Sequence, residues 1–287
     1  RIWSPASKEG ESIVINAHRK DVNSVDFGSD SASLLLSCSN DKTAKIWHLP
    51  SQKFACSFIG HTNWVRAAKF SPDSRLVATG SDDKTVKIWD AHYTSSQDTC
   101  IATYDLFSIG VSSLDFHPDR TILAAASNDI KFWDLRSNSL IQHYPSDIVS
   151  DPISTIGFHP SGNYLLSADI NGKATIWDVR EGRFLVSLDI SHRGSESKDC
   201  ASARFSSCGR SLITGETHRS VKLWSTKNLD LCLDFVGGSS LCASDEAVLF
   251  ADGQQPKDGN LRSNKRNVDE ESPSLARSLS KIFANSA

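Results

Sequence analysis

Short runs in which apolar and polar residues alternate follow one another along most of the chain, separated by clusters of turn-forming residues. Clear runs cover residues 24–27 (SVDF), 76–79 (LVAT) and 85–89 (TVKIW). Such short runs are typical of β-strands, whereas helical repeats need longer segments with a 3.6-residue period. The pattern therefore predicts an all-β fold.

Tryptophan gives these strands a regular spacing. Six of the seven tryptophans end a short run, at intervals of 44, 42, 44, 44 and 47 residues: Trp3, Trp47, Trp89, Trp133, Trp177 and Trp224. A period in the low forties is typical of the four-stranded blades of a β-propeller. The sequence therefore predicts a propeller over residues 1–251 with about five complete blades.

The first two units share a second set of spacings, because in each a histidine lies nine residues before a phenylalanine and an aspartate six residues before the tryptophan. This pattern resembles the WD repeat, in which a histidine, a strand hydroxyl, a turn aspartate and the tryptophan form a hydrogen-bonded network. The resemblance implies that role for two sets of residues: His18, Ser37, Asp41 and Trp47, then His61, Thr79, Asp83 and Trp89.

The later units keep the spacing and lose parts of this network. In the third unit Phe107 takes the histidine position and Ala125 the hydroxyl position, so we expect that blade to depend on packing. The fourth and fifth units retain these network candidates: Ser167, Asn171 and Trp177, with Val149 in place of histidine, and Thr214, His218 and Trp224, with His192 displaced by an insertion.

Two further histidines, His117 and His159, lie in Phe-His-Pro turns after the first strand of a unit. We expect both to be solvated and structural rather than ligands.

The two ends of the chain differ from its middle. Residues 1–3 (RIW) align with Lys45-Ile46-Trp47, which suggests an incomplete first blade and a parent protein of seven blades, with six as the alternative. We expect an outer strand over residues 229–236 and a weak strand over 246–251. Residues 252–273 are polar and predict a flexible linker. Residues 274–287 predict the start of an amphipathic helix, and self-association through a coiled coil of the parent protein.

Composition excludes several classes of function. The net charge of −3 gives no field that attracts nucleic acid or an anionic membrane, so neither is expected as a partner. The seven cysteines are scattered without a C-x-x-C pair, which favours reduced thiols in an intracellular protein over disulfides or a metal site.

No catalytic arrangement stands out. The sequence has no His-x-x-x-His, G-x-S-x-G or Walker motif, and the recurring aspartates and histidines belong to the blade pattern. We therefore predict that the chain is not an enzyme and needs no cofactor.

A binding surface is the more plausible source of function, because propellers present loops on a rigid support. Trp64 aligns with Asp21 of the preceding unit, so the repeat itself does not require an aromatic residue there. It either anchors a partner or packs against a neighbouring blade. Arg66 and Asp82 are expected near the same face.

The residues between the motifs resemble one family more specifically. Residues 61–73 (HTNWVRAAKFSPD), 140–144 (LIQHY) and 158–165 (FHPSGNYL) are similar to the centriolar WD-repeat proteins called proteome of centriole. The resemblance covers about residues 1–226. It implies a structural protein of the cytoskeleton that binds components of the microtubule wall at centrioles and basal bodies and supports cilium assembly.

A second resemblance competes with this one. Two W-D-x-R sequences, ending at Arg136 and Arg180, resemble the motif by which WD-repeat substrate receptors dock on the adaptor of a cullin ubiquitin ligase. The same arginines could instead pair with strand ends inside the blade.

Overall fold

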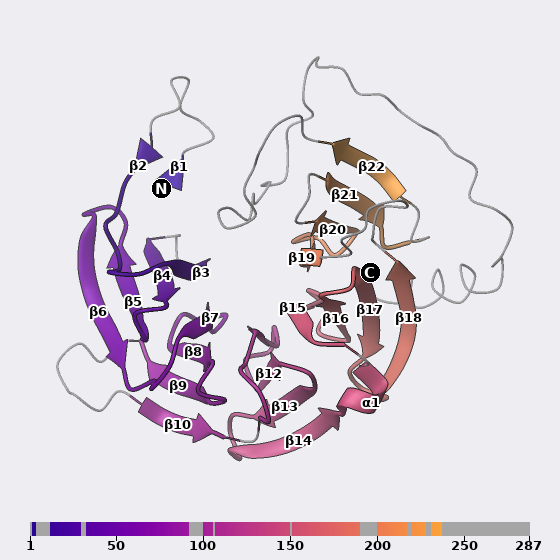
Figure 1. Cartoon of the computed structure of the whole chain (residues 1–287), viewed down its shortest axis with the longest axis horizontal. Helices are drawn as coiled ribbons and strands as arrows, with labels where there is room; N and C mark the ends of the chain where they lie inside the picture. The colour runs from indigo at the N-terminus through magenta and orange to yellow at the C-terminus, as the bar shows by residue number, and fades with distance from the viewer. Residues whose placement is uncertain are drawn as a thin grey trace, which may run out of the picture. The chain divides into compact units, whose positions relative to one another are not determined.

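The structure is a computed structural model, and it describes the following residues: 2–3, 12–29, 33–91, 100–105, 107–149, 151–189, 200–216, 220–227 and 231–236. The described part contains five four-stranded antiparallel sheets, each formed by strands consecutive in sequence (Figure 1). The prediction of an all-β fold with five complete blades is confirmed. The chain divides into two compact parts, residues 1–143 and residues 144–287.

The first blade has the strand order β3-β4-β5-β6. Its strands are β3 (Val22–Phe27), β4 (Leu34–Ser39), β5 (Thr43–His48) and β6 (Lys53–Ile59). Five of the six residues of β4 are buried, because this central strand is covered on both faces. Phe54 of the outer strand β6 is exposed and packs edge-on against Trp47.

The second blade repeats this arrangement. It consists of β7 (Val65–Phe70), β8 (Leu76–Ser81), β9 (Val86–Asp90) and β10 (Cys100–Tyr104). A hydrophobic core joins it to the first blade, with these buried residues: Leu36, Cys38, Ala44, Ile46, Phe58, Val65, Ala68, Phe70, Val77 and Trp89. The inner strands β3 and β7 lie side by side.

The third blade is formed by β11 (Ser113–Phe116), β12 (Ile122–Ala126), β13 (Ile130–Asp134) and β14 (Ser139–Tyr144). Its inner strand β11 lies beside β7. Leu123 to Ala126 of β12 are fully buried, and Leu123 and Ala125 share a hydrophobic core with residues of the second blade.

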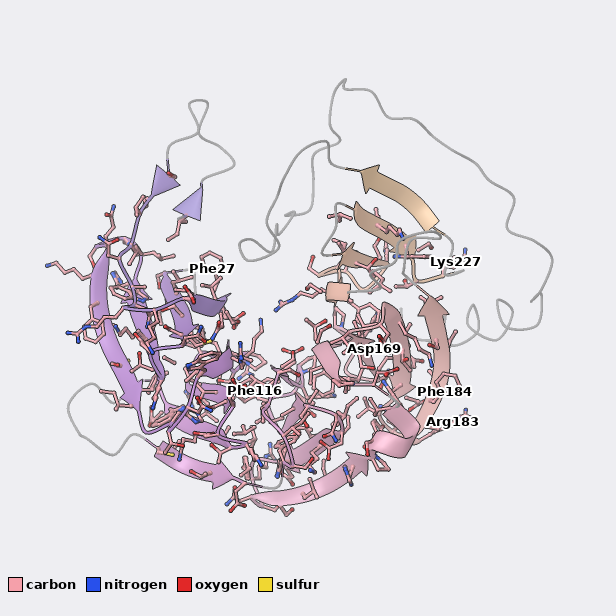
Figure 2. All side chains as sticks on the ribbon, in the orientation of Figure 1. Phe27, Phe116, Asp169, Arg183, Phe184 and Lys227 are labelled. Carbon is pink, nitrogen blue, oxygen red and sulfur yellow. The ribbon has the colours of Figure 1, made fainter. Side chains whose placement is uncertain are left out.

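Within residues 144–287, the fourth blade contains β15 (Ile153–Phe158), β16 (Tyr164–Asp169), β17 (Lys173–Asp178) and β18 (Arg183–Asp189). A four-residue helix, α1 (Ser146–Val149), precedes β15 and is the only helix in the described part of the chain. Phe184 and Arg183, both exposed, lie on the outer strand β18 (Figure 2).

The fifth blade contains β19 (Cys200–Phe205), β20 (Ser211–Glu216), β21 (Ser220–Ser225) and β22 (Leu231–Val236). The last of these strands corresponds to the outer strand expected over residues 229–236. The strand expected over residues 246–251, the linker 252–273 and the helix 274–287 lie outside the described residues.

At the start of the chain, β1 (Ile2–Trp3) pairs with β2 (Ser12–Ile13) as a two-stranded sheet. This pairing agrees with the alignment of residues 1–3 to a third strand, because in each complete blade the third strand pairs with the fourth.

The expectation that both Phe-His-Pro histidines are solvated is wrong for His159. Its ring is only 7% exposed and lies edge-on to Tyr164 and Phe205. Its Nε2 is 3.2 Å from the carbonyl oxygen of Gly209, where φ is +70° and an added Cβ would come within 2.3 Å of that nitrogen. His159 is therefore a packing residue between the fourth and fifth blades, whose inner strands lie side by side.

Strand register fixes which residues share an edge of a blade. In the second blade Val65 pairs with Ser81, Gly80 with Val86, and Val86 with Tyr104. The start of the first strand and the end of the second therefore lie together. We call this end of each sheet, where the first strand begins and the second strand ends, the leading edge. The trailing edge is the opposite end, where the first strand ends and the second strand begins. Neither term refers to an outermost strand.

Candidate functional site

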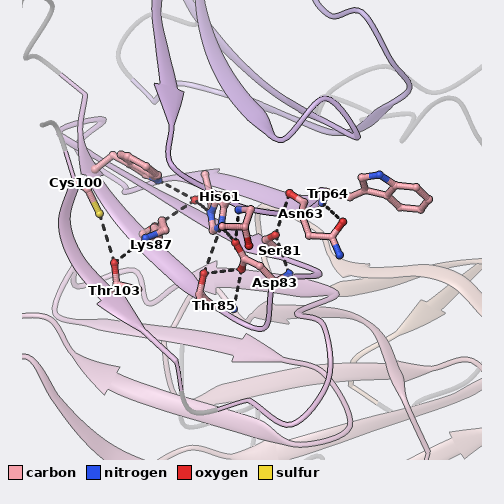
Figure 3. Close-up of polar contacts among 12 residues, drawn as sticks. His61, Asn63, Trp64, Ser81, Asp83, Thr85, Lys87, Cys100 and Thr103 are labelled. Atoms are coloured by element: carbon pink, nitrogen blue, oxygen red, sulfur yellow. Dashed lines mark hydrogen bonds and ion pairs between the residues drawn. The ribbon is translucent and has the colours of Figure 1, made fainter. Parts of the chain in front are cut away.

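The leading edge of the second blade is held by a complete hydrogen-bonded network (Figure 3). Trp89 Nε1 donates to Thr79 Oγ1 at 2.8 Å, and Thr79 Oγ1 lies 2.7 Å from His61 Nε2. His61 Nδ1 lies 2.8 Å from Asp83 Oδ2. The four residues expected to act together are thus brought together, and they join the loop before β7 to β8 and β9.

The donors and acceptors of this network fix the state of His61. An ionised carboxylate only accepts, so His61 Nδ1 donates to Asp83, and in a neutral ring Nε2 then accepts from the Thr79 hydroxyl, whose oxygen accepts from Trp89 Nε1. Burial is the main cause that lowers the pKa of His61 below its usual value, which agrees with a neutral ring.

Asp83 stays ionised at the other end of the network. Burial opposes its ionisation, but hydrogen bonds from Thr85 and His61 outweigh this and lower its pKa. The Thr62 backbone N–H also donates to its carboxylate, at 2.9 Å. The aspartate therefore serves the blade as an acceptor and is not available as a general base.

The first blade has the same arrangement. His18 lies 2.9 Å from Asp41 and 2.8 Å from the Ser37 hydroxyl, which accepts from Trp47 Nε1 at 3.0 Å. Burial opposes ionisation of Asp41, yet hydrogen bonds from Thr43 and His18 lower its pKa to about 2.

The third blade holds its tryptophan by aromatic packing. Trp133 is 1% exposed, stacks on Tyr104 with ring centroids 4.9 Å apart, and contacts Phe107 at 5.6 Å. The expectation that this blade depends on packing agrees with these contacts.

The turn aspartate of the third blade has other partners. Asp129 forms an ion pair with buried Lys131 at 2.7 Å and contacts His143 at 3.0 Å. The Lys131 ammonium lies 4.5 Å from the centroid of the Phe107 ring, a cation–π contact. Sequence reasoning missed this substitute, in which a lysine ammonium takes the place of the neutral histidine that donates to the turn aspartate in the first two blades.

Among the residues that the structure describes, the fourth and fifth blades show the inner half of the network. Trp177 donates to Ser167 at 2.8 Å, and Trp224 donates to Thr214 at 3.0 Å. Asn171 was assigned to the network, but the structure places it at the surface, because Asp169 accepts from the backbone of the turn instead.

Three other residues of these two blades were named from the sequence: Val149, His192 and His218. Val149, which stands at the histidine position, lies in α1 and is buried. His192 and His218 lie outside the described residues.

An aromatic residue near the end of an outer strand packs on the tryptophan that follows in sequence, which the sequence interpretation did not identify. Phe58 contacts Trp89 at 5.4 Å, and Tyr144 stacks on Trp177 at 4.8 Å. Tyr104 stacks on Trp133 in the same way. The signal was present as an aromatic residue about thirty positions before each of these tryptophans, near the end of a strand.

Next to the His61–Asp83 network of the second blade lies a cluster of three exposed or half-buried side chains, which we call the Trp64 cluster: Trp64, Arg66 and Asp82. Trp64 is 40% exposed, and its ring points away from the network in Figure 3. The Arg66 guanidinium lies 4.8 Å from the Trp64 ring centroid, and its Nε donates to Asp82 Oδ2 at 2.9 Å. The structure therefore brings the three predicted residues together and leaves the indole accessible.

The cluster borders an open hollow of about 340 Å³ at the leading edge of the first three blades. Asn23 of the first blade, Arg66 and Asp82 of the second, and Gly110 and Ser112 of the third line it. A Cβ on Gly110 would come within 2.7 Å of Asp82 Oδ1 and 3.0 Å of its Cα, so the close approach requires glycine there. Three blades thus contribute to one polar surface.

The accessible indole and the polar hollow suit this surface to binding a partner. Among the described residues, no group of three or more His, Cys, Asp or Glu side chains could hold a metal ion. No helix in that same part of the chain is long and apolar enough to cross a membrane.

The two W-D-x-R arginines lie at trailing edges, each in a different unit. Asp134 accepts from the Arg136 backbone at 2.8 Å, and Asp178 accepts from the Arg180 backbone at 2.9 Å. Both arginine side chains are exposed.

The repeated sheets and their networks define an all-β WD-repeat propeller with five blades. A family model described as WD domain, G-beta repeat matches residues 11–48, 52–90, 98–134 and 138–178, which is more than half of the chain. The chain therefore belongs to this family. Propellers of this class mediate protein–protein interactions and are generally non-catalytic scaffolds.

Several curated proteins are similar to this chain. The transcriptional corepressor LEUNIG_HOMOLOG of Arabidopsis thaliana is 28% identical over 200 residues, covering 69% of this chain and 24% of the relative. The nuclear distribution protein PAC1 of Arthroderma otae is 28% identical over 222 residues, covering 67% and 47%. A guanine nucleotide-binding protein subunit beta of Oryza sativa subsp. japonica is 25% identical over 238 residues, covering 77% and 62%. The chain thus matches less than two thirds of the length of each.

Proposed function

We propose that this chain is a non-catalytic interaction scaffold at centrioles and basal bodies, where it binds protein components of the microtubule wall. The observation that carries the docking role is the Trp64 cluster, an accessible indole held against an arginine at the edge of a rigid blade. Tryptophan and arginine are enriched among the residues that dominate protein–protein binding energy.

The support beneath the cluster explains why it suits docking. The Asp82 backbone N–H donates to the Trp64 carbonyl at 2.9 Å, next to the His61–Asp83 network. The Asp82 carboxylate fixes Arg66 against the indole. A partner therefore meets side chains that are already ordered, which reduces the conformational entropy lost on binding.

The centriolar assignment rests on the residues between the repeat motifs. Residues 61–73, which contain Trp64 and Arg66, resemble the centriolar WD-repeat family, as do residues 140–144 and 158–165. With that assignment we propose a place in the cytoskeleton, support of cilium assembly, and self-association through a coiled coil that begins in residues 274–287.

Fluorescent tagging of the full chain in ciliated cells tests this function. We expect foci that coincide with a centriole marker, and weaker foci for Trp64→Ala. The matched control is Phe184→Ala, which removes an exposed aromatic side chain from the outer strand β18 and should leave the foci intact. Diffuse fluorescence of the unmodified chain would contradict the centriolar proposal, and equal foci for both variants would contradict the docking role of Trp64.

A second candidate function is a substrate receptor of a cullin-type ubiquitin ligase, favoured by the exposure of Arg136 and Arg180 after aspartate-capped turns. Pull-down of the tagged chain distinguishes the two candidates. Recovery of a ligase adaptor that is lost with Arg136→Ala and Arg180→Ala supports the receptor, whereas recovery of tubulin or wall proteins that is insensitive to these changes supports the scaffold.

A further inference from the structure

We propose that the leading edge of the first two blades binds an acidic peptide segment of its partner, with carboxylates on its lysines and an apolar side chain on Trp64. This inference rests on the proposed docking function and specifies the chemistry of the partner. It depends on three features of this edge: unpaired positive charge, lysines held in an unfavourable backbone conformation, and the position of the indole.

The first feature is charge. Four exposed basic side chains lie at this edge: Arg19, Lys20, Lys42 and Lys84. The backbone places the three residues of the first blade together, because Arg19 N donates to Asp41, Ser39 Oγ donates to the Lys20 carbonyl, and Lys42 N donates to the Ser39 carbonyl. Lys84 occupies the equivalent turn of the second blade, where its N–H donates to the Ser81 carbonyl. Within the part of the chain that the structure describes, none of the four forms an ion pair.

At the trailing edge, within residues 1–143, basic side chains lie closer to a carboxylate. Arg75 and Arg120 both approach Asp73, with nitrogen to oxygen distances of 4.0 and 3.9 Å. At the leading edge Asp82 pairs with Arg66, but among the described residues no carboxylate forms an ion pair with Arg19, Lys20, Lys42 or Lys84, and these four cations are left to solvent or to a ligand. The contrast is notable in a chain whose net charge is −3.

The second feature is backbone conformation. Lys42 and Lys84 occupy equivalent turn positions with φ of 72° and 71°, a left-handed conformation that disfavours residues with a Cβ. In the fourth blade, Gly172 fills the same position with φ of 78°. Glycine therefore fits this turn, and the lysines of the first two blades are present despite a conformational cost. Positive φ also occurs at trailing-edge turns, at Gln52, Ser74, Arg120 and Asn138, so the feature specific to the leading edge is that this turn position carries a lysine in both blades.

The third feature is the indole of the Trp64 cluster, which lies at the leading edge of the second blade. Arg66 covers one part of the Trp64 ring while 40% of the residue remains exposed. The exposed surface suits an aliphatic or aromatic side chain, and the guanidinium edge suits a carboxylate. A peptide that alternates acidic and apolar residues meets both requirements.

The same edge is less suited to nucleic acid. Asp21 and Asp82 lie among the basic residues, with Asp21 exposed. A phosphate backbone carries closely spaced charges and would pass close to these carboxylates, whereas a peptide can place its acidic residues between them. Nucleic acid is therefore an outcome of the test and not the proposal.

The test measures fluorescence anisotropy of a short fluorescein-labelled peptide of glutamate and glycine with one central phenylalanine, titrated with the full chain. We expect binding that weakens as sodium chloride is raised. The double variant Lys42→Gly/Lys84→Gly, which installs the residue of the fourth blade, should weaken binding about fivefold, since each exposed charge pair contributes modestly. Its thermal stability should be equal or higher, so loss of folding cannot explain the effect.

The matched control is Lys53→Gln/Arg75→Gln, which removes the same charge from exposed positions at the trailing edge of the same two blades. It should bind the peptide as the unmodified chain does. A peptide with glutamine in place of glutamate should not bind.

Three results would overturn the inference: no binding of the acidic peptide, equal loss in both double variants, or tighter binding of a single-stranded oligonucleotide than of the peptide. Centriolar foci that persist without peptide binding would remove this inference and leave the proposed function standing. Peptide binding without centriolar foci would do the reverse.

Discussion

The second and third blades hold the same tryptophan in different ways. In the second blade the Trp89 indole N–H begins a chain of hydrogen bonds that ends at Asp83. In the third blade Trp133 stacks on Tyr104 and contacts the tilted ring of Phe107, and Ala125 stands where the hydroxyl would be. The comparison indicates that the buried indole is the constant requirement of the repeat, while either polar bonding or aromatic packing can secure it.

The largest effect should come from removing the packed indole. Trp133→Ala deletes a side chain that is 1% exposed, so we expect a loss of about 3–5 kcal/mol in the free energy of unfolding, measured by urea denaturation. Trp64→Ala is the control, because its half-exposed ring should cost less than about 1 kcal/mol. Similar losses for the two variants would mean that packing around Trp133 is not what holds the third blade.

A smaller loss should follow from transplanting the third-blade residue into the second blade. His61→Phe removes one hydrogen-bond partner from each of Asp83 and Thr79, which should cost about 2–3 kcal/mol. The exposed neighbour Thr62→Ala should change stability by less than about 0.5 kcal/mol. If His61→Phe is neutral, the two ways of holding the tryptophan are interchangeable one residue at a time, and the network is not a unit.

Lowering the pH should reduce the free energy of unfolding through His61 of the second blade, by less than the substitutions above. The third blade has Phe107 at that position and makes no such contribution. Burial lowers the pKa of His61, so the unfolded chain binds a proton more readily than the folded chain below about pH 6.5. The stability present above that pH is then lost as pH falls toward the folded-state pKa, by at most about 1.4 kcal/mol per pH unit for this histidine.

Urea denaturation at roughly pH 7.5 and 5.5 measures this loss. The unmodified chain should lose more stability between the two values than His61→Phe does, since the variant has no proton to gain at that position. The same pH dependence in both proteins would show that His61 is not held neutral by the fold.

The smallest effect concerns the fourth blade. Asn171→Ala should change the free energy of unfolding by less than about 0.5 kcal/mol, because this side chain is exposed and Asp169 holds the turn. The aligned change in the first blade, Asp41→Ala, should cost about 1–3 kcal/mol through the bonds it removes from His18 and Thr43. Equal costs would return Asn171 to the network.

The sequence was sufficient for the fold and for the complete networks. Regular tryptophan spacing predicts the blades because each strand pairs with its neighbour in sequence, and local order then determines topology. His61 and Asp83 could be placed in one network because, as in the first blade, the histidine lies nine residues before a phenylalanine and the aspartate six residues before the tryptophan.

Substitutes for the network could not be predicted, because they depend on distances that sequence spacing does not give. Lys131 pairs with Asp129 because the shorter turn of the third blade brings the two side chains together, with the lysine against the Phe107 ring. His159 is buried because the fifth blade presents Gly209 to it, a contact fifty residues away in sequence. The Trp64 cluster was expected from alignment, but its hollow depends on Gly110 from the next blade.

The central claim is that partners dock at the leading edge beside Trp64. Replacing Trp64 with the photoreactive residue p-benzoylphenylalanine in cells, and Phe184 in a parallel experiment, tests it most directly through the proteins that become cross-linked. The account predicts that a wall protein of the centriole, at an acidic segment, is cross-linked from position 64 and not from position 184. Cross-links to the same protein from position 184 alone, or none from position 64, would contradict it.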